Sequence, residues 1–394
     1  MTAAEIQQKI DEAFNQGGGA VVLPAETHVL DTALRLKPGV ALRGASRQAV
    51  LTTKDPNANL IELVSGNGGA AHDVEISNLQ IKGPGTHQDI TKDVSDDPEK
   101  GCGIFVSTVG DHKEVSNVVI QGCHIENVSG SGIHFRSRHD VLVKDVTIKK
   151  CTLHQNRRPP ENGKSQSYKD IFFYGTRFEN IRVEGNSCTF TPNRSSPYGN
   201  DSGIAFVINR KDCGGCFVKN VHLIGNTCSG HRRHGIITNY GSMPAFDVEV
   251  RRNTCTDNRW VGIYVNTNIE EGRNVTIEDN TCDHNGYGGS SDPTAPDKTI
   301  RGGIVLSGCY NSQINNNHCN SNGCPSKDFS GADASAKHAP GIRVRGKNLT
   351  LKRNEARKNK GGDVEKWPEP YENVKEEGTK KDFFLRRLFR KFLC

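Results

Sequence analysis

The sequence predicts an all-β solenoid, a parallel β-helix wound from a single chain, with a capping helix at its N-terminus and an amphipathic helical tail at its C-terminus. Three observations predict the solenoid. A short strand-and-turn segment recurs along the chain, a Gly-Ile pair begins a second strand in most units, and cysteine and asparagine return at fixed positions of the repeat. Fixed-period repeats are typical of solenoids, because each unit buries its apolar face by stacking on its neighbours.

Composition excludes two other classes of protein. Of the 394 residues, 34% are hydrophobic and 42 are glycine. This apolar content is normal for a folded chain and too high for a disordered one. No stretch approaches the roughly 18 consecutive apolar residues that a membrane-spanning helix needs.

Two elements alternate along the chain. The first is an apolar strand followed by a turn, seen at 181–188, 221–228, 248–255, 275–282, 314–319 and 349–356, and more loosely at 74–79, 118–123 and 146–151. The second begins with Gly-Ile, at glycines 103, 132, 203, 235, 262, 303 and 341. The unit from Gly235 to Gly262 is about 27 residues long, close to one coil of a parallel β-helix.

Cysteine and asparagine mark the register of the repeat. One position holds Cys123, Cys151, Cys188, Cys228, Cys255, Cys282 and Cys319, with Leu79 before and Ala356 after. Because stacked strands bring equivalent side chains to about 4.8 Å, we expect one internal ladder of seven cysteines. A metal or redox role is the alternative, but the cysteines are too far apart in sequence for a metal knuckle, so we interpret them as apolar filler.

Asparagine occupies two further positions of the repeat. It precedes the cysteine position by two residues in one row and follows it by three in another: Asn186, Asn226, Asn253, Asn280, Asn317 and Asn354, then Asn258, Asn285, Asn322 and Asn359. Asparagine tolerates left-handed turn conformations and bonds the backbone. We therefore expect both rows to shape turns and to bond coil to coil.

The two ends differ from the repeats. Ile6, Ile10, Ala13 and Phe14 form one helical stripe, which predicts a helix over residues 3–16 in an N-terminal cap of residues 1–18. The solenoid is predicted over 19–360, and 361–394 as a linker and basic tail. The tail has an apolar and a basic helical face. The apolar face consists of Phe384, Leu385, Leu388, Phe389 and Phe392, and the basic face consists of Arg386, Arg387, Arg390 and Lys391. Such a helix is either a C-terminal cap or a membrane-surface or partner-binding element.

The opening segment and the repeats together resemble a known class. The stretch IQQKIDEAFNQGGGAVVLPAETHVL, followed by LKPGVALRG, and the repeats as far as about residue 360 resemble the right-handed parallel β-helix proteins of the pectate-lyase-like class. That class includes pectin lyases, polygalacturonases, alginate epimerases and phage tailspikes. The resemblance implies a right-handed solenoid and a polysaccharide ligand, and it points to no specific family within the class.

Insertions locate a candidate site. The long ones precede the Gly-Ile strands, at 83–101, 155–169, 190–202, 286–302 and 323–340, and the coils entered at Gly235 and Gly262 lack them. Because loops on a rigid scaffold commonly build binding sites, we expect these loops to form two walls of a cleft. The two short coils would form its floor.

The floor and its neighbours carry the candidate residues. We assign the catalytic role to Asp201, Arg233, His234 and Tyr264. We assign substrate binding to His231, Arg232, Asn239, Asp257, Arg259, Trp260 and Asn266, with Arg136 and Arg138 from a wall. Arginine binds carboxylates through two nitrogens, and aromatic rings stack on sugar rings. The pattern therefore favours an acidic sugar chain, and a solvated basic turn is the alternative interpretation.

Two chemistries fit these residues. In β-elimination or epimerisation of a uronate, His234 or Tyr264 removes the proton beside the carboxylate and an arginine stabilises the enolate-like intermediate. In glycoside hydrolysis or transglycosylation, two carboxylates at a defined separation are needed. His234-Gly235-Ile236 and Asp201 resemble polygalacturonase motifs. That family has a pair of aspartates where this chain has Asp201 alone, and Asp170 is a loose counterpart of the family's third aspartate. Asp201 and Asp257 could pair at about 9–10 Å across two coils.

Elimination or epimerisation is the leading hypothesis, because basic groups outnumber acids on the floor. The alternatives are a hydrolase, a tailspike-like glycan-binding protein that forms homotrimers, and an intracellular effector whose tail docks on membranes. We expect a polysaccharide partner, no nucleic acid, and no metal or other cofactor; the calcium-binding carboxylate cluster of pectate lyases is not visible. No secretory signal is visible at the N-terminus, which leaves a cytoplasmic, phage-particle, non-classically exported or mature secreted location open.

Overall fold

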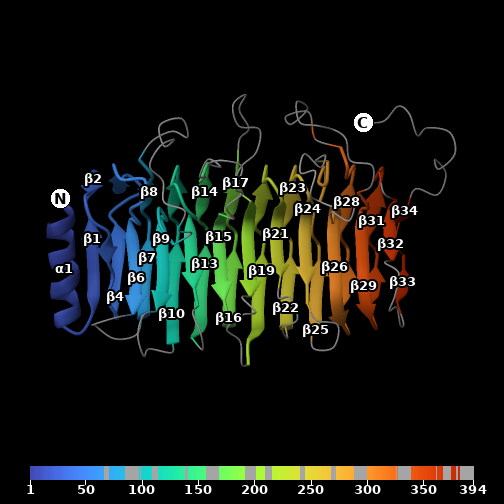
Figure 1. Cartoon of the computed structure of the whole chain (residues 1–394), viewed down its shortest axis with the longest axis horizontal. Coiled ribbons are helices and arrows are strands. Elements are labelled where there is room, and N and C mark those ends of the chain that lie inside the picture. Colours follow the sequence, from blue (N-terminus) through green and yellow to red (C-terminus); the bar gives the residue numbers. More distant parts are fainter. Residues whose placement is uncertain are drawn as a thin grey trace.

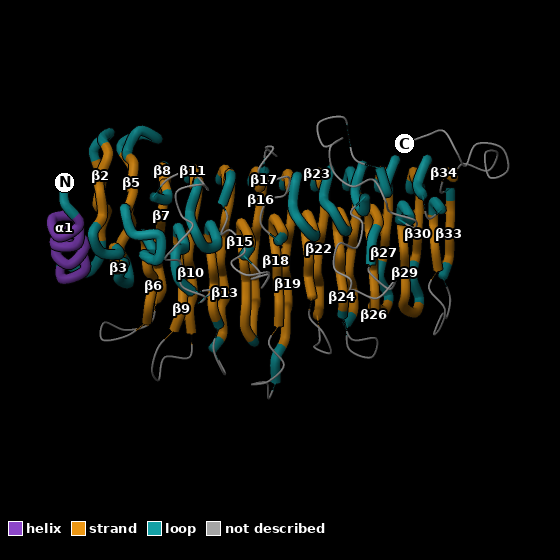
Figure 2. Tube along the Cα trace, turned by 45° about the horizontal axis from the view of Figure 1, so that its top comes forward, coloured by secondary structure: helices purple, strands orange, loops and turns teal. Residues whose placement is uncertain are grey.

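Parallel strands stacked from one coil of the chain to the next make up most of the molecule (Figure 1). In this computed structural model the described residues are 1–65, 71–84, 97, 99–108, 114–137, 141–156, 168–190, 201–208, 215–239, 245–267, 272–287, 300–324, 326, 339–360, 362–366, 374–378 and 380–381. The strands of successive coils stack in three parallel rows along the solenoid (Figure 2), each called a sheet here. Two of these rows are joined at one pair of residues, Arg273 and Tyr310.

The sheet that carries the candidate site is called here the Gly-Ile sheet, after the pair at which most of its strands begin. It consists of β3 (Leu34–Arg35), β6 (Ile61–Ser65), β9 (Ile104–Thr108), β12 (Ile133–Arg136), β15 (Lys169–Gly175), β18 (Ser202–Ile208), β21 (His234–Asn239), β24 (Val261–Asn266), β26 (Gly302–Tyr310), β29 (Ile342–Lys347) and β32 (Val364–Lys366). Neighbouring strands pair in parallel and in register.

Two further sheets close each coil. The long sheet consists of β1 (Gly19–Leu23), β4 (Val40–Gly44), β7 (Ala71–Ser77), β10 (Glu114–Gln121), β13 (Leu142–Lys149), β16 (Arg177–Glu184), β19 (Phe217–Ile224), β22 (Ala245–Arg251), β25 (Arg273–Glu278), β27 (Gln313–Asn315), β30 (Thr350–Lys352) and β33 (Lys375–Glu377).

The narrow sheet has mostly three-residue strands. It consists of β2 (Thr27–Leu30), β5 (Val50–Thr53), β8 (Gln80–Lys82), β11 (His124–Glu126), β14 (Thr152–His154), β17 (Ser187–Thr189), β20 (Thr227–Ser229), β23 (Thr254–Thr256), β28 (His318–Asn320), β31 (Glu355–Arg357) and β34 (Lys380–Lys381). Thr281 continues the sheet between β23 and β28 through two isolated bridges.

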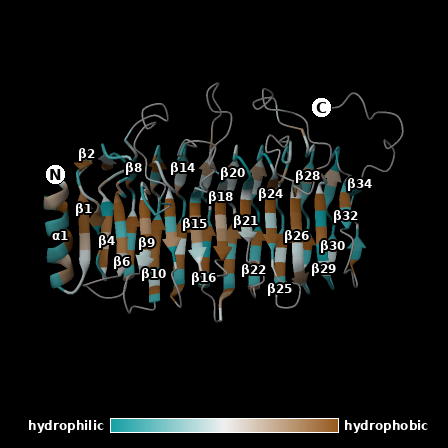
Figure 3. Cartoon of the chain, in the orientation of Figure 1, coloured by the Kyte–Doolittle hydropathy of each residue, from teal (hydrophilic) through white to brown (hydrophobic). Residues whose placement is uncertain are grey.

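The core lies inside the coils. Along strands of the long sheet such as β10 and β13, buried side chains mostly alternate with more exposed ones, and the ribbon has a striped hydropathy (Figure 3). The isoleucines of the Gly-Ile pairs stack as one fully buried column. Beside them Phe173 stacks on Phe135 and on Phe206, with ring centroids 4.8 and 4.3 Å apart.

Close backbone contact explains the glycine of each Gly-Ile pair. A Cβ on Gly235 would lie 2.7 Å from the carbonyl oxygen of Gly262 and 2.9 Å from Nδ2 of Asn258. Both distances are too short for a carbon atom. The glycine therefore leaves room for the neighbouring coil and for an asparagine side chain inside the turn.

Helix α1 (Ala3–Asn15) covers the N-terminal end of the solenoid (Figure 1) and confirms the predicted cap helix. Thr2 and Glu5 form a capping box, in which the Thr2 hydroxyl accepts a hydrogen bond from the Glu5 amide at 3.2 Å and the Glu5 carboxylate accepts one from the Thr2 amide at 2.8 Å. Ile6 and Ile10 are fully buried. A solenoid needs such a cap, since its terminal coil otherwise exposes the core.

The other end of the solenoid lies beyond its predicted boundary. Strands β32, β33 and β34 continue the three sheets as far as Lys381. The boundary at residue 360 was therefore placed too early, and part of the predicted linker belongs to the last coil. The predicted tail helix lies outside the described residues apart from Lys380 and Lys381.

The cysteines form two columns, which corrects the expected ladder of seven. Cys188 pairs in register with Leu153 and not with Cys151, and it stacks with Cys228, which stacks with Cys255. Cys151 lies in the column of Asn186 instead, where its amide donates to Asn186 Oδ1 at 2.9 Å. Cys123 and Cys151 are therefore offset by two residues from the column of Cys188, Cys228, Cys255, Cys282 and Cys319.

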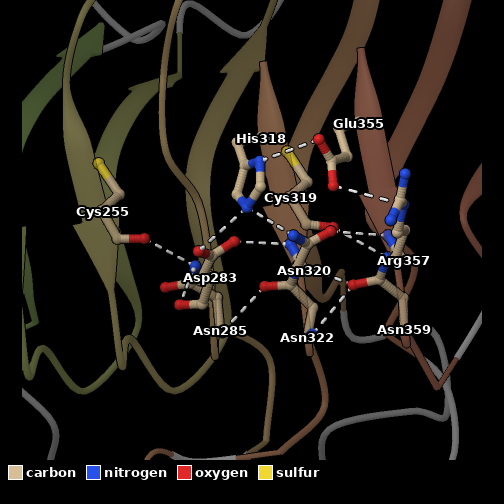
Figure 4. A network of polar contacts seen from close by, with 10 residues as sticks. All are labelled: Cys255, Asp283, Asn285, His318, Cys319, Asn320, Asn322, Glu355, Arg357 and Asn359. Atoms are coloured by element: carbon tan, nitrogen blue, oxygen red, sulfur yellow. Dashed lines mark hydrogen bonds and ion pairs between the residues drawn. The ribbon is translucent and has the colours of Figure 1, made fainter. Parts of the chain in front are cut away.

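Both asparagine rows bond from coil to coil. In the first row Asn226 donates from its backbone and side-chain nitrogens to Asn253 Oδ1, at 2.9 and 3.0 Å. The other members of the row repeat this pattern. In the second row Asn322 Nδ2 donates to Asn359 Oδ1 at 2.9 Å, as seen in Figure 4. Each amide is thereby satisfied inside the solenoid, where an unpaired polar group would be costly.

Candidate functional site

Three successive coils place a carboxylate, a guanidinium and an indole in one column. The amide of Arg233 donates to the carbonyl of Asp201 at 2.9 Å, and the amide of Trp260 donates to the carbonyl of Arg233 at 2.8 Å. Asp201 and Arg233 immediately precede β18 and β21, and Trp260 immediately precedes β24. These residues, with His234, Tyr264 and Lys169, are called here the site cluster.

Asp201 is buried between two cations. Its residue is 6% exposed. Lys169 Nζ lies 3.0 Å from Oδ2, Arg233 Nε lies 3.0 Å from Oδ1, and Arg233 Nη1 donates to Oδ2 at 3.2 Å. Burial opposes ionisation, but the two cations outweigh it and lower the pKa of Asp201. Asp201 is therefore held ionised by the two cations that contact it.

Arg233 is the more exposed of the two cations. Its side chain is 29% exposed, and its guanidinium lies 4.8 Å from the centroid of the Trp260 ring. A cation over an indole face is attracted to the ring and held in orientation. Lys169 is buried, and the pKa of its amine is lowered, chiefly by burial. Arg233 is therefore the cation of the pair that a ligand can reach.

His234 lies between two aromatic rings. Its centroid is 5.6 Å from that of Trp260 in an edge-on contact and 5.7 Å from that of Tyr264 in a stacked one. Nδ1 lies 3.4 Å from the Ser202 hydroxyl oxygen. Burial lowers the pKa of His234 to about 3, so that the imidazole is neutral at neutral pH. Burial also raises the pKa of the Tyr264 phenol to about 12, and that side chain stays partly exposed.

Comparisons with known proteins identify the fold family. A family model described as the right-handed β-helix region matches residues 57–295. The chain belongs to this right-handed β-helix family. No curated protein matches the sequence.

Two solved structures illustrate the likeness. The A-module of mannuronan C-5 epimerase AlgE4 from Azotobacter vinelandii is 16% identical and has a TM-score of 0.51, with 96% of this chain and 95% of that chain covered. PfbA, a surface adhesin of Streptococcus pneumoniae, is 12% identical and has a TM-score of 0.63, with 96% and 91% covered. At these identities the likeness extends to the right-handed β-helix and no further.

Within this β-helix, His231 belongs to the interior and not to the site cluster. It is fully buried, with Nδ1 2.9 Å from Asn258 Oδ1 and Nε2 3.0 Å from Asp170 Oδ2. Asp170 Oδ1 in turn accepts from Asn156 Nδ2 at 3.3 Å. Asp170 and His231 thus continue the second asparagine row inside the turns. The substrate contact predicted for His231 is wrong because no part of its side chain reaches the surface.

The other predicted binding residues are dispersed. Asp257 and Arg259 are buried, with 9% and 8% exposed, and Asp257 Oδ1 accepts from the Ser326 amide at 2.8 Å. Arg232 and Asn266 are partly exposed beside the site cluster. Arg136 lies on another part of the same sheet, at the end of β12. The side chain of Asn239, all of Arg138, and most of the predicted wall loops lie outside the described residues.

Lys169 is the member of the site cluster that sequence analysis missed. It falls at the end of a predicted wall loop, and no motif distinguishes it from other lysines. The pairing of the strands could have identified it. Lys169 pairs with Ser202, and Ser202 pairs with His234, so the three residues lie at the same level of neighbouring strands. The described part of the chain contains no group of three or more His, Cys, Asp or Glu side chains suited to a metal ion. No helix in that part is both long enough and apolar enough to cross a membrane.

Proposed function

We propose that the protein binds an acidic polysaccharide at the site cluster and removes the proton beside a uronate carboxylate, leading to β-elimination or epimerisation. The observation that carries this proposal is the arrangement around Asp201. Two cations contact one carboxylate, and the guanidinium of Arg233 lies partly exposed over the Trp260 ring. A guanidinium edge binds a carboxylate, and the neighbouring aromatic rings suit the apolar face of a sugar.

The protonation state of His234 and the charge of Arg233 support different roles for these two residues. His234 is neutral and can accept the proton from the ring carbon beside the carboxylate. The electron pair left on that carbon delocalises onto the carboxylate, where Arg233 stabilises the added charge. A bound carboxylate also raises the pKa of His234 toward that of an effective base.

The second half of the reaction needs a proton donor. Tyr264 keeps its phenolic proton at neutral pH and stacks on His234. In elimination the electron pair forms a carbon–carbon double bond as the bond to the glycosidic oxygen breaks, and Tyr264 protonates that oxygen. In epimerisation Tyr264 gives its phenolic proton to the same carbon from the opposite face, and the protonated His234 then restores the phenol through solvent.

The contacts of Asp201 weigh against the hydrolase alternative. A glycosidase needs a carboxylic acid that is protonated near neutral pH. The pKa of Asp201 is lowered by Lys169 and Arg233, which hold it ionised. Asp257, its suggested partner, is buried and accepts a hydrogen bond from the Ser326 amide.

A glycan-binding protein without turnover is the second candidate. The burial of His234 favours it, since only 6% of the residue is exposed and a base with a pKa of about 3 is weak until a ligand raises that pKa. The same site cluster would then bind the acidic chain without reacting.

Hydrogen exchange tests the two candidates together. Mannuronan, guluronan and polygalacturonate are incubated with the protein in heavy water, and deuterium at the carbon beside the carboxylate is measured by NMR, with ultraviolet absorbance for unsaturated products. We expect exchange, and we expect His234→Gln to slow it by roughly 10²–10⁴-fold with little change in affinity. His222→Gln, on the long sheet, is the matched control. Binding without exchange favours the second candidate, and saturated products lost with Asp201→Asn favour the hydrolase.

A further inference from the structure

The outer face of the Gly-Ile sheet carries an apolar cluster separate from the core. Phe172, Ala205 and Ile237 form its buried part, and Tyr174, Val207 and Tyr264 pack against them while partly exposed. Four of these residues follow one register line across β15, β18, β21 and β24: Phe172, Ala205, Ile237 and Tyr264. This set of six residues is called here the outer-face cluster. It begins at the site cluster, since Tyr264 belongs to both.

Cations lie at both ends of the outer-face cluster. At one end Lys169 Nζ lies 5.1 Å from the centroid of Phe172, beside Asp201 and Arg233. At the other end the Arg136 guanidinium lies 4.1 Å from the centroid of Tyr174. Phe172 and Tyr174 connect the two ends, with ring centroids 5.5 Å apart.

Arg136 repeats the arrangement of Arg233. Glu99, which precedes β9, holds Arg136 on β12 through Oε1 and Nε at 3.1 Å, and Arg136 covers Tyr174 on β15. A carboxylate, an arginine and an aromatic ring thus come from three successive coils, as Asp201, Arg233 and Trp260 do. Glu99 accepts a hydrogen bond from Nε of Arg136, and within the described residues Nη1 is a buried donor without a hydrogen-bond partner. Such a donor is unfavourable until an acceptor reaches it.

The two arginines are too far apart to hold one sugar ring. Their coils are three strand spacings apart, or about 14 Å at about 4.8 Å each. Arg136 is also displaced along the strand direction, because it shares a register line with Asn239, well beyond Arg233. Only a chain of several sugars can reach both.

We propose that Glu99, Arg136 and Tyr174 form a second acid-binding subsite for the same ligand, so that the protein takes a polyuronate chain lying across the outer-face cluster with carboxylates at both Arg233 and Arg136. The proposal rests on the proposed function. The cationic ends select a chain with repeated acidic groups over a neutral glycan, and the aromatic rings between them receive the apolar faces of the intervening sugars.

Calorimetric titration with a dimer and an octamer of galacturonate, and with the same lengths of mannuronate, tests this. We expect an octamer to bind more tightly than its dimer. Arg136→Gln should weaken octamer binding by roughly tenfold to a hundredfold, the effect of one charge-assisted hydrogen bond, and leave dimer binding unchanged. Arg136→Lys should fall between, since it keeps the charge and loses the planar fork. Arg182→Gln, on the long sheet where Arg182 pairs with Glu184, is the matched control.

The outcomes separate the two proposals. If both lengths bind equally well and only Arg233→Gln weakens them, the second subsite is refuted and the proposed site stands. If neither octamer binds, or if Arg233→Gln has no effect on binding, the proposed function fails and the subsite fails with it. Thermal melting of Arg136→Gln shows whether the variant is folded, and a melted variant is replaced by Tyr174→Leu, which removes the ring and keeps the arginine.

Discussion

Lys169 and Asp201 form an ion pair inside the molecule, with 3.0 Å between Nζ and Oδ2 and with only 4% and 5% of the two side chains exposed. The pair joins β15 to the turn before β18. Because Arg233 contacts the same carboxylate, Lys169 and Arg233 together compensate the charge of Asp201. A residue without a recognisable motif thus helps to hold the central carboxylate of the candidate site ionised.

Replacing Lys169 by Met should destabilise the protein by about 3 kcal/mol. Removing one partner of a buried pair typically costs 3–5 kcal/mol, and Arg233 still neutralises part of the charge on Asp201. Urea denaturation measures the change. Lys219→Met is the control, because Lys219 pairs with Glu179 on the surface, where a salt bridge contributes about 0–1 kcal/mol. Equal losses for the two variants would contradict the assigned role of Lys169.

Stability should decrease with falling pH because of His234. Its pKa is lowered from 6.5 to about 3 in the folded protein, so the unfolded chain takes up the proton first as the pH falls. One proton changes the free energy of unfolding by at most about 1.4 kcal/mol per pH unit. The loss should run from about pH 6.5 down to about pH 3. The lowered pKa of Asp201 adds a further loss at the acid end of this range.

Urea unfolding across this pH range should show a smaller slope for His234→Gln than for the wild type. The control variant His222→Gln keeps His234, so the part of the pH slope that comes from His234 should be the same as in the wild type. Identical slopes for wild type and His234→Gln would mean that the imidazole is not held neutral in the folded state.

The two cysteine columns should respond oppositely to asparagine. Cys151 Sγ lies 3.8 Å from the Ile120 carbonyl oxygen, and Ile120 pairs in register with Ile148, whose carbonyl accepts from Asn186 Nδ2 at 3.0 Å. Cys151→Asn should therefore add one rung to the asparagine row and leave the melting temperature at or above that of the wild type.

Cys255→Asn should be destabilising by about 1–3 kcal/mol, because it buries an amide among thiols without a partner. Cys255→Ala should cost about 1–2 kcal/mol through a small cavity and leave activity unchanged. Thermal denaturation of the three variants distinguishes two columns from one. If Cys151→Asn and Cys255→Asn changed the melting temperature equally, the result would favour one ladder of seven cysteines over two columns.

The C-terminal tail remains a prediction from its sequence. Deleting residues 382–394 keeps β34 intact. If the tail caps the last coil, the truncated protein should melt at a lower temperature or aggregate. If the tail is a membrane or partner element, the truncated protein should keep its melting temperature and lose binding to anionic liposomes. Sedimentation with liposomes and thermal melting measure the two outcomes.

The sequence by itself determined the solenoid, its N-terminal cap, the Gly-Ile strands and the position of Asp201, Arg233, His234, Trp260 and Tyr264 on neighbouring coils. These features follow from periodicity, because a repeat of constant form places equivalent residues side by side. Periodicity did not reveal that Cys123 and Cys151 are offset by two residues from the column of Cys188. A shift of two residues keeps the same alternation of buried and exposed side chains, so the repeat looks the same in the sequence.

Only the tertiary structure decided which polar residues lie at the candidate site and which support the fold. His231 and His234 are three residues apart in one basic segment, yet His231 bonds Asp170 and Asn258 inside the turn while His234 lies between Trp260 and Tyr264. Lys169 and Asp201 are 32 residues apart, with a length of chain between them that varies from coil to coil. Burial and charge compensation depend on which coils lie at the same level, and that is a property of the stacked structure and not of any one segment.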